Sequence, residues 1–240
     1  MKKEKTLYGI GIGPGDPELI TLKGRNLIEK ADCIFVPKSS ATEASLAKEI
    51  VSALEVGNKN FIEIHFPMTG DEELLQNKYK DAAILIIEEM KNKETAAYLT
   101  LGDPLLYSTF IYLARALKEV SGDIKIETIP GITTASAAAA KFNFALAEKK
   151  EKVLTAALPE TKEEMKDMIL ENDTVIFYKA SKKLPLLFEV INEMNLEKSS
   201  VFCSRLGLED EKLLDGRVEP FVLPEGKNYL STVLIRRQKS

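Results

Sequence analysis

The sequence has no tryptophan, a single histidine (His65) and two cysteines among its 240 residues. Cys33 and Cys203 stand far apart and form no CxxC pair, so we expect neither a disulfide framework nor a protein-bound metal. No apolar run reaches the ~18 residues of a membrane-spanning helix, and the N-terminus lacks the apolar segment of a signal peptide. These absences predict a soluble, cytoplasmic protein with no membrane partner.

The sequence also lacks an excess of basic charge. It has 33 Lys and Arg against 37 Asp and Glu, with a pI near 5.4. General nucleic-acid binding requires a basic face, so no nucleic-acid partner is expected, although a local basic patch is compatible with this balance. With 45% hydrophobic residues, the chain can build one large core or two smaller ones.

Strand-like and helix-like segments alternate along the chain, which predicts α/β layers. Strands are expected at 6–11, 33–37, 61–66, 95–102, 124–129, 152–156, 173–180, 199–207 and 231–237, and helices at 21–30, 41–54, 71–91, 109–120, 133–141, 161–171 and 183–195. The pattern restarts after the linker-like tripeptide 121–123. We therefore expect two α/β domains, residues 1–120 and 124–240, with a ligand-binding cleft between them and a partly antiparallel second sheet.

The glycine-rich stretch YGIGIGPGDPELITLKG (residues 8–24) invites a comparison with nucleotide-binding loops. A dinucleotide fingerprint needs G-x-G-x-x-G, but the sixth position is Pro14 or Asp16, depending on the starting glycine. The fingerprint also needs an acid at the end of the second strand, whereas Asp32 lies at its beginning. No P-loop motif is present. The stretch is better interpreted as a tight, rigid turn between a strand and a helix.

Three further clusters follow strands, where ligands bind in α/β sheets. In GDP (residues 102–104), Asp103 either accepts hydrogen bonds from a ligand or simply forms the turn. In IPGITTASA (129–137), a threonine caps a helix or offers a hydroxyl. In TVIFYKA (174–180), the backbone faces a ligand or the segment is a plain core strand. Each cluster is a weak signal alone.

Taken together, the order of these clusters resembles the tetrapyrrole (class III) S-adenosylmethionine-dependent methyltransferases over nearly the whole chain. The pieces that carry the resemblance are GIGIGPGDPELITLKG, GDP, IPGITTASA, TVIFYKA and YLSTVLI. Within the family, ADCIFVPKS and GDPLLYSTF look most like enzymes that methylate C(20) of precorrin-2 or cobalt-precorrin-2. Uroporphyrinogen methyltransferases typically have a GGDP loop, whereas this chain has Leu101 before Gly102.

The resemblance implies a class III methyltransferase fold, a homodimer and S-adenosylmethionine held in the interdomain active-site cleft, with S-adenosylhomocysteine as product. By motif, the cofactor-binding residues are Gly102, Asp103, Leu105, Leu106, Thr133, Thr134, Tyr178, Lys179, Ala180, Leu206 and Thr232. Pro14 and Gly15 border the tetrapyrrole, whose many carboxylates need cations such as Lys38 and Arg205.

The implied chemistry needs no metal ligand set and no nucleophilic triad, because orientation of an activated methyl group supplies much of the rate enhancement. His65 is therefore interpreted as structural. A tyrosine, either Tyr229 or Tyr107, is a candidate to assist the departing proton. The alternatives are another tetrapyrrole methylase (acting on precorrin-3B, precorrin-4 or uroporphyrinogen), a diphthine synthase-like methyltransferase, and a non-catalytic nucleotide-binding α/β protein. The residues do not tell whether the substrate already contains cobalt.

Overall fold

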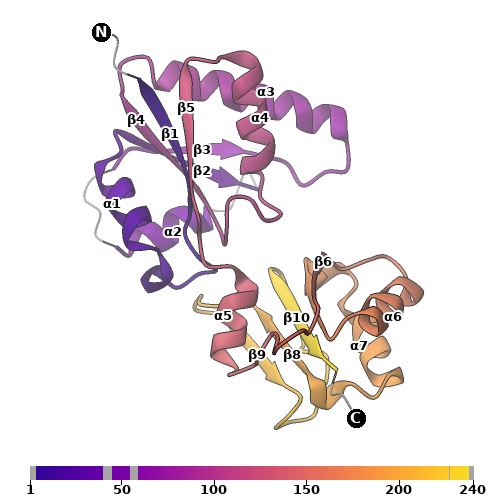
Figure 1. Cartoon of the computed structure of the whole chain (residues 1–240). Helices are drawn as coiled ribbons and strands as arrows, with labels where there is room; N and C mark the ends of the chain where they lie inside the picture. The colour runs from indigo at the N-terminus through magenta and orange to yellow at the C-terminus, as the bar shows by residue number, and fades with distance from the viewer. Residues whose placement is uncertain (1–3, 40–44, 55–58, 227, 238–240) are drawn as a thin grey trace. The chain divides into compact units, whose positions relative to one another are not determined.

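The computed structural model describes residues 4–39, 45–54, 59–226 and 228–237, and the chain divides into two compact units, Met1–Thr133 and Thr134–Ser240. Each unit has its own five-stranded sheet and its own hydrophobic core, with helices on both faces of the sheet (Figure 1). The predicted fold class, two α/β domains, is confirmed. Among the described residues, no helix is long and apolar enough to cross a membrane.

The sheet of the first unit is parallel throughout, in the order β3-β2-β4-β1-β5. Its strands are β1 (Lys5–Gly11), β2 (Cys33–Lys38), β3 (Phe61–His65), β4 (Thr95–Thr100) and β5 (Ile124–Ile129). The connecting helices are α1 (Leu22–Lys30), α2 (Leu46–Ser52), α3 (Glu72–Glu89) and α4 (Phe110–Val120), with a short 3₁₀ turn, η1 (Pro17–Leu19), before α1. Because all strands point the same way, the loops that follow them gather at one end of the sheet, where the carboxyl ends of the strands lie.

Local sequence signals explain where these helices lie. Thr21 caps α1 by accepting a hydrogen bond from the Gly24 amide, and Asp71 caps α3 in the same way. The chain moves in opposite directions across the sheet before and after β3, and crossovers are right-handed, so the helices divide between the faces. Helices α1 and α2 cover one face, and α3 and α4 cover the other (Figure 1).

The predicted boundary at residues 121–123 is wrong. Strand β5 pairs with β1 along its whole length, from Lys5 opposite Ile124 to Ile10 opposite Ile129. It therefore belongs to the first sheet, and the division falls after Thr133. The Ser-Gly-Asp tripeptide is an ordinary turn between α4 and β5. It looked like a linker because turn residues mark a change of direction, which occurs within domains as well as between them.

The sheet of the second unit is mixed, in the order β6-β7-β10-β8-β9, and the predicted antiparallel character is confirmed. Its strands are β6 (Val153–Ala157), β7 (Thr174–Tyr178), β8 (Ser200–Ser204), β9 (Lys212–Asp215) and β10 (Ser231–Arg236). The helices are α5 (Thr134–Lys141), α6 (Lys162–Glu171) and α7 (Leu184–Glu193), with 3₁₀ turns η2 (Ala180–Lys182) and η3 (Glu197–Ser199). The short edge strand β9 was not predicted.

Alternation along the central strands separates two cores in this unit. Val175 and Phe177 pack with α6 and α7, whereas Ile176 faces the other side with α5. Helix α6 begins with a capping box, in which Thr161 and Glu164 bond each other's backbone amides. The strand predicted at 173–180 ends at Tyr178, because Lys179 has a left-handed backbone (φ 55°).

Candidate functional site

Three loops of the first unit meet where β1, β4 and β5 end, since these strands are neighbours in the sheet. The Gly102 amide donates a 2.8 Å hydrogen bond to the Gly13 carbonyl, which joins the β4 loop to the β1 loop. At Gly11 an added Cβ would lie 2.5 Å from the Gly102 oxygen and 2.6 Å from the Gly131 Cα. The loops are thus packed backbone against backbone, at a distance that only glycine permits.

Gly102 itself is the open point of this cluster. Its backbone is left-handed (φ 66°), and an added Cβ would meet no atom within 4 Å among the described residues. The backbone of the GDP loop is therefore accessible to a ligand there, while Gly11 is enclosed by protein atoms. This arrangement favours GDP over the first glycine stretch as a binding surface.

Asp103 accepts hydrogen bonds with both of its carboxylate oxygens. Oδ1 accepts a 2.9 Å hydrogen bond from the Leu105 amide, and Oδ2 accepts a 3.0 Å hydrogen bond from the Gly131 amide. The first bond forms the local turn, and the second ties the β4 loop to the β5 loop. Asp103 therefore has the turn-forming role that the sequence left open, together with a long-range contact that the sequence did not indicate.

Buried hydroxyl groups support the start of α4 beneath this loop. The Thr100 and Ser108 hydroxyls lie 2.9 Å apart, and the Ser108 oxygen also accepts a hydrogen bond from the Phe110 amide. Between them Tyr107 has a left-handed backbone (φ 54°) and an exposed ring. Such strain is found where the surroundings hold a residue in place, often at functional sites. Leu105 is exposed beside it.

The predicted residues of the second unit gather at one end of its sheet. Thr232 lies opposite Tyr178 on one side and Cys203 on the other, and buried Leu206 follows β8. The Tyr178 hydroxyl accepts a 3.0 Å hydrogen bond from the Ala135 amide, in the first turn of α5. Tyr178 is thus more than the plain core residue that the sequence allowed, because it positions the helix that begins at Thr134.

Two unpaired hydroxyl groups lie at the same end. Ser204 and Ser231 face each other across β8 and β10, and each is 1% exposed. Within the described chain, neither Oγ has a hydrogen-bond partner. Buried hydroxyls are ordinarily paired, so an unpaired couple adds polarity to this end of the sheet. No sequence signal distinguished these serines from ordinary strand residues.

The two cations predicted to bind the substrate already have acidic partners. The Lys38 Nζ lies 3.1 Å from Glu63, and Arg205 forms an ion pair with Asp210. Pro14 and Gly15 are buried, so they offer little surface to a large ligand. Tyr229 is exposed in the segment before β10, and Ala180 is fully buried at the start of η2.

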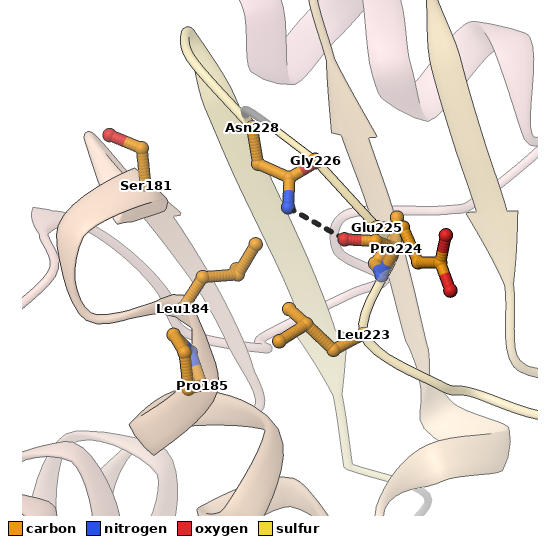
Figure 2. A pocket seen from close by; sticks show the side chains of 8 residues that line it. All are labelled: Ser181, Leu184, Pro185, Leu223, Pro224, Glu225, Gly226 and Asn228. Atoms are coloured by element: carbon orange, nitrogen blue, oxygen red, sulfur yellow. Dashed lines mark hydrogen bonds between the residues drawn. The ribbon is translucent and has the colours of Figure 1, made fainter.

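A cavity of about 430 Å³ lies in the second unit, between the start of α7 and the segment before β10 (Figure 2). Leu184, Pro185 and Leu223 give it an apolar wall, and the Asn228 amide donates a 2.9 Å hydrogen bond to the Pro224 carbonyl. Of the eight side chains drawn in Figure 2, Glu225 carries a charge, and its carboxylate points away from the apolar wall. None of the residues that line this cavity is among the site residues predicted from the sequence.

The structure shows the surroundings of two polar residues that the sequence analysis considered, Asp32 and His65. Asp32 accepts hydrogen bonds from the Glu94 and Thr95 amides at 3.0 and 2.8 Å, and these bonds hold the pKa of its carboxyl below the ordinary value, the Thr95 amide contributing most. Asp32 therefore fixes the beginning of β4 in place, far from the carboxyl ends of the strands, where a ribose would bind. His65, at the end of β3, is exposed, so it does not serve the core. Among the described residues, no group of three or more His, Cys, Asp or Glu could hold a metal ion.

Comparison with known families assigns the chain. The family model described as Tetrapyrrole (Corrin/Porphyrin) Methylases matches residues 6–221. The chain belongs to this family. The predicted resemblance is therefore confirmed, and the glycine turn, the GDP loop and the Tyr178 strand all lie inside the matched region.

Several relatives of this tetrapyrrole methylase align along its whole length. A protein of Methanocaldococcus jannaschii named as a probable cobalt-precorrin-2 C(20)-methyltransferase is 36% identical over 238 residues, covering 99% of each chain. The cobalt-precorrin-2 C(20)-methyltransferase of Salmonella typhimurium is 24% identical, covering 97% of this chain and 96% of the relative.

Solved structures share the fold at lower identity. A cobalt precorrin-4 methyltransferase has a TM-score of 0.67 at 19% identity, covering 96% of this chain and 94% of the other. The uroporphyrin-III C-methyl transferase of Thermus thermophilus, solved in complex with S-adenosyl homocysteine, has a TM-score of 0.65 at 15% identity, covering 96% of this chain and 92% of the other. These likenesses confirm the class III fold of the methylase.

Proposed function

We propose that the protein transfers a methyl group from S-adenosylmethionine to the C(20) meso carbon of cobalt-precorrin-2 or precorrin-2 in cobalamin biosynthesis. The observation that carries the proposal is the full-length match, 36% identical over 99% of both chains, to a relative named for this reaction. Leu101, in place of the glycine of a GGDP loop, also favours the C(20) branch.

The residues of the first unit fit such a cofactor. S-adenosylmethionine, when bound, supplies a methyl group already activated by its sulfonium. Gly102 offers an accessible backbone with no side chain above it, and Asp103 holds that backbone in register with the β5 loop. Leu105 and Leu106 follow on the same loop as candidate apolar contacts. The protein's task is orientation, because alignment of donor and acceptor lowers the barrier without acid or metal catalysis.

The remaining site assignments belong to the same proposal. By motif, the proposal assigns Thr133, Thr134, Tyr178, Lys179, Leu206 and Thr232 to the cofactor, whereas Ala180 is fully buried and is assigned no direct contact. Tyr107, whose ring is exposed on the GDP loop, is a candidate to assist the departure of the proton from C(20), and Tyr229 is the other. The enzyme acts as a cytoplasmic homodimer without a metal of its own.

Incubation with cobalt-factor II and methyl-labelled S-adenosylmethionine tests the reaction. The expected product carries one labelled methyl group at C(20), located by nuclear magnetic resonance. Methylation at another ring position would reassign the enzyme within the family. Calorimetric titration with S-adenosylhomocysteine is a separate check, and absence of binding together with absence of turnover would favour a non-catalytic protein.

A further inference from the structure

A cluster of two lysines and one glutamate stands apart from the loops described above. Glu63 on β3 lies 3.1 Å from the Nζ of Lys38, the last residue of β2, and 3.6 Å from the Nζ of Lys48 on α2. The side chains of Lys38, Glu63 and Lys48 are 18%, 31% and 44% exposed, so all three reach solvent. The Lys38 hydrogen bond holds the pKa of the Glu63 carboxyl below its ordinary value, which keeps this acid charged at neutral pH.

The cluster has an excess of positive charge. Two ammonium groups share one carboxylate, whereas each of the other ion pairs among the described residues of the first unit joins one cation to one acid. His65 lies opposite Lys38 in the β2–β3 register, so it projects to the same face and adds no negative charge. An ammonium group has three donors, and Lys38 can keep Glu63 while donating to a second anion.

The cluster lies at the carboxyl ends of the strands of the first sheet, on the same side as the cofactor loops. Lys38 and His65 end parallel strands, and β2 lies directly beside β4, whose end carries the GDP loop. Neighbouring strands are about 4.8 Å apart, so the end of β3 lies roughly 10 Å from the end of β4. A large planar ligand lying over this edge spans that distance.

We propose that Lys38 and Lys48 together bind a carboxylate of the tetrapyrrole substrate, while Glu63 holds the two ammonium groups side by side for it. This inference rests on the proposed function, because it takes a polycarboxylated ring as the ligand. Hydrogen bonds between charged groups are stronger than neutral ones, and partial exposure reduces their contribution here. Lys48, Glu63 and the sharing of one counter-ion were not indicated by the sequence.

The test compares Lys38→Gln, Lys48→Gln and the double variant with the unmodified protein. The dissociation constant for cobalt-factor II, measured by absorbance titration, should rise about tenfold in each single variant, the equivalent of about 1.4 kcal/mol. Affinity for S-adenosylhomocysteine should not change. Lys118→Gln is the matched control, because Lys118 is an exposed lysine near the end of α4, at the opposite edge of the sheet.

Glu63→Gln separates substrate binding from a structural role. If Glu63 positions the two ammonium groups for the ring carboxylate, the glutamine variant should bind cobalt-factor II a few-fold more weakly than the unmodified protein, because a neutral amide holds ammonium groups less strongly than a carboxylate. If the cluster is only structural, all three single variants should lose thermal stability and keep the same dissociation constant, which would overturn the inference. Tight binding without methylation would refute the proposed function but leave the binding test valid. If the unmodified protein does not bind cobalt-factor II in the absorbance titration, both the proposed function and this inference are refuted.

Discussion

Replacing Asp103 by alanine should destabilise the first unit by about 2 kcal/mol and also weaken binding of S-adenosylmethionine. The substitution removes the acceptors of the Leu105 and Gly131 amides. The bond to Leu105 is exposed and local, so water replaces it at a cost of roughly 0.5 kcal/mol, whereas the part-buried bond to Gly131 is worth about 1.5 kcal/mol. Loss of the second bond frees the GDP loop from the β5 loop, and the cofactor must then order that loop as it binds.

Urea unfolding followed by circular dichroism measures the first effect, and calorimetric titration measures the second. Hydrogen exchange adds a local readout, because the Gly131 amide should lose protection. Asp16→Ala is the matched control. Asp16 lies in the neighbouring β1 loop and accepts one local hydrogen bond, from the Glu18 amide at 2.8 Å. It should lose about 0.5 kcal/mol at most, so the difference between the two variants reports the bond to Gly131.

Two results would refute this reasoning. Unchanged stability with lost affinity would mean that Asp103 acts on the cofactor directly and that its contacts with the backbone are energetically unimportant. Lower stability with unchanged affinity would mean that the loop connection does not serve the cofactor site. Only a joint loss, larger than in Asp16→Ala, agrees with a residue that positions the loop.

Three further predictions follow from the packing and the charges. Gly131→Ala should destabilise the fold by more than about 2 kcal/mol, because the new Cβ would lie 2.1 Å from the Gly102 oxygen, whereas Gly70→Ala has nothing within 4 Å and should be neutral in urea unfolding. Asp32→Asn should lower stability by under about 1 kcal/mol at pH 7. Since the folded pKa of Asp32 is lowered, that difference should shrink as the pH falls through its ordinary value of 3.8 and below. Burial raises the pKa of the Cys203 thiol to about 12, so iodoacetamide should label it at pH 8 only after unfolding; rapid labelling of the native protein would contradict the buried position.

The layout of the loops could be predicted because it depends on local patterns. Apolar strands followed by Gly or Pro mark the ends of strands, and parallel strands bring those ends to one edge. For the same reason the sequence showed that a helix starts at Thr21, and that Asp32 lies at the wrong end of its strand to bind a ribose. Family motifs then added the GDP loop as a candidate cofactor surface, and the open space above Gly102 is compatible with that prediction.

Strand order was not accessible in the same way. Nothing local in residues 124–129 indicates that they pair with β1, so the domain boundary was placed too early and the bond from Gly131 to Asp103 went unseen. The short strand β9 has only four residues, too few for a clear alternating pattern. The shared counter-ion Glu63 depends on α2 packing beside the ends of β2 and β3, which again is a property of the assembled sheet.

The alternating glycines of the first strand illustrate how packing imitates a nucleotide motif. At Gly9 an added Cβ would lie 2.0 Å from the Phe110 ring, so this glycine makes room for α4. Gly11 makes room for the β5 loop, and Gly13 turns the chain toward Gly102. Close packing within the first unit therefore explains Gly9 and Gly11, and a left-handed backbone (φ 76°) explains Gly13, without any phosphate. A ligand at this edge meets the β4 loop first, because the β1 loop is already enclosed by the loops that it supports.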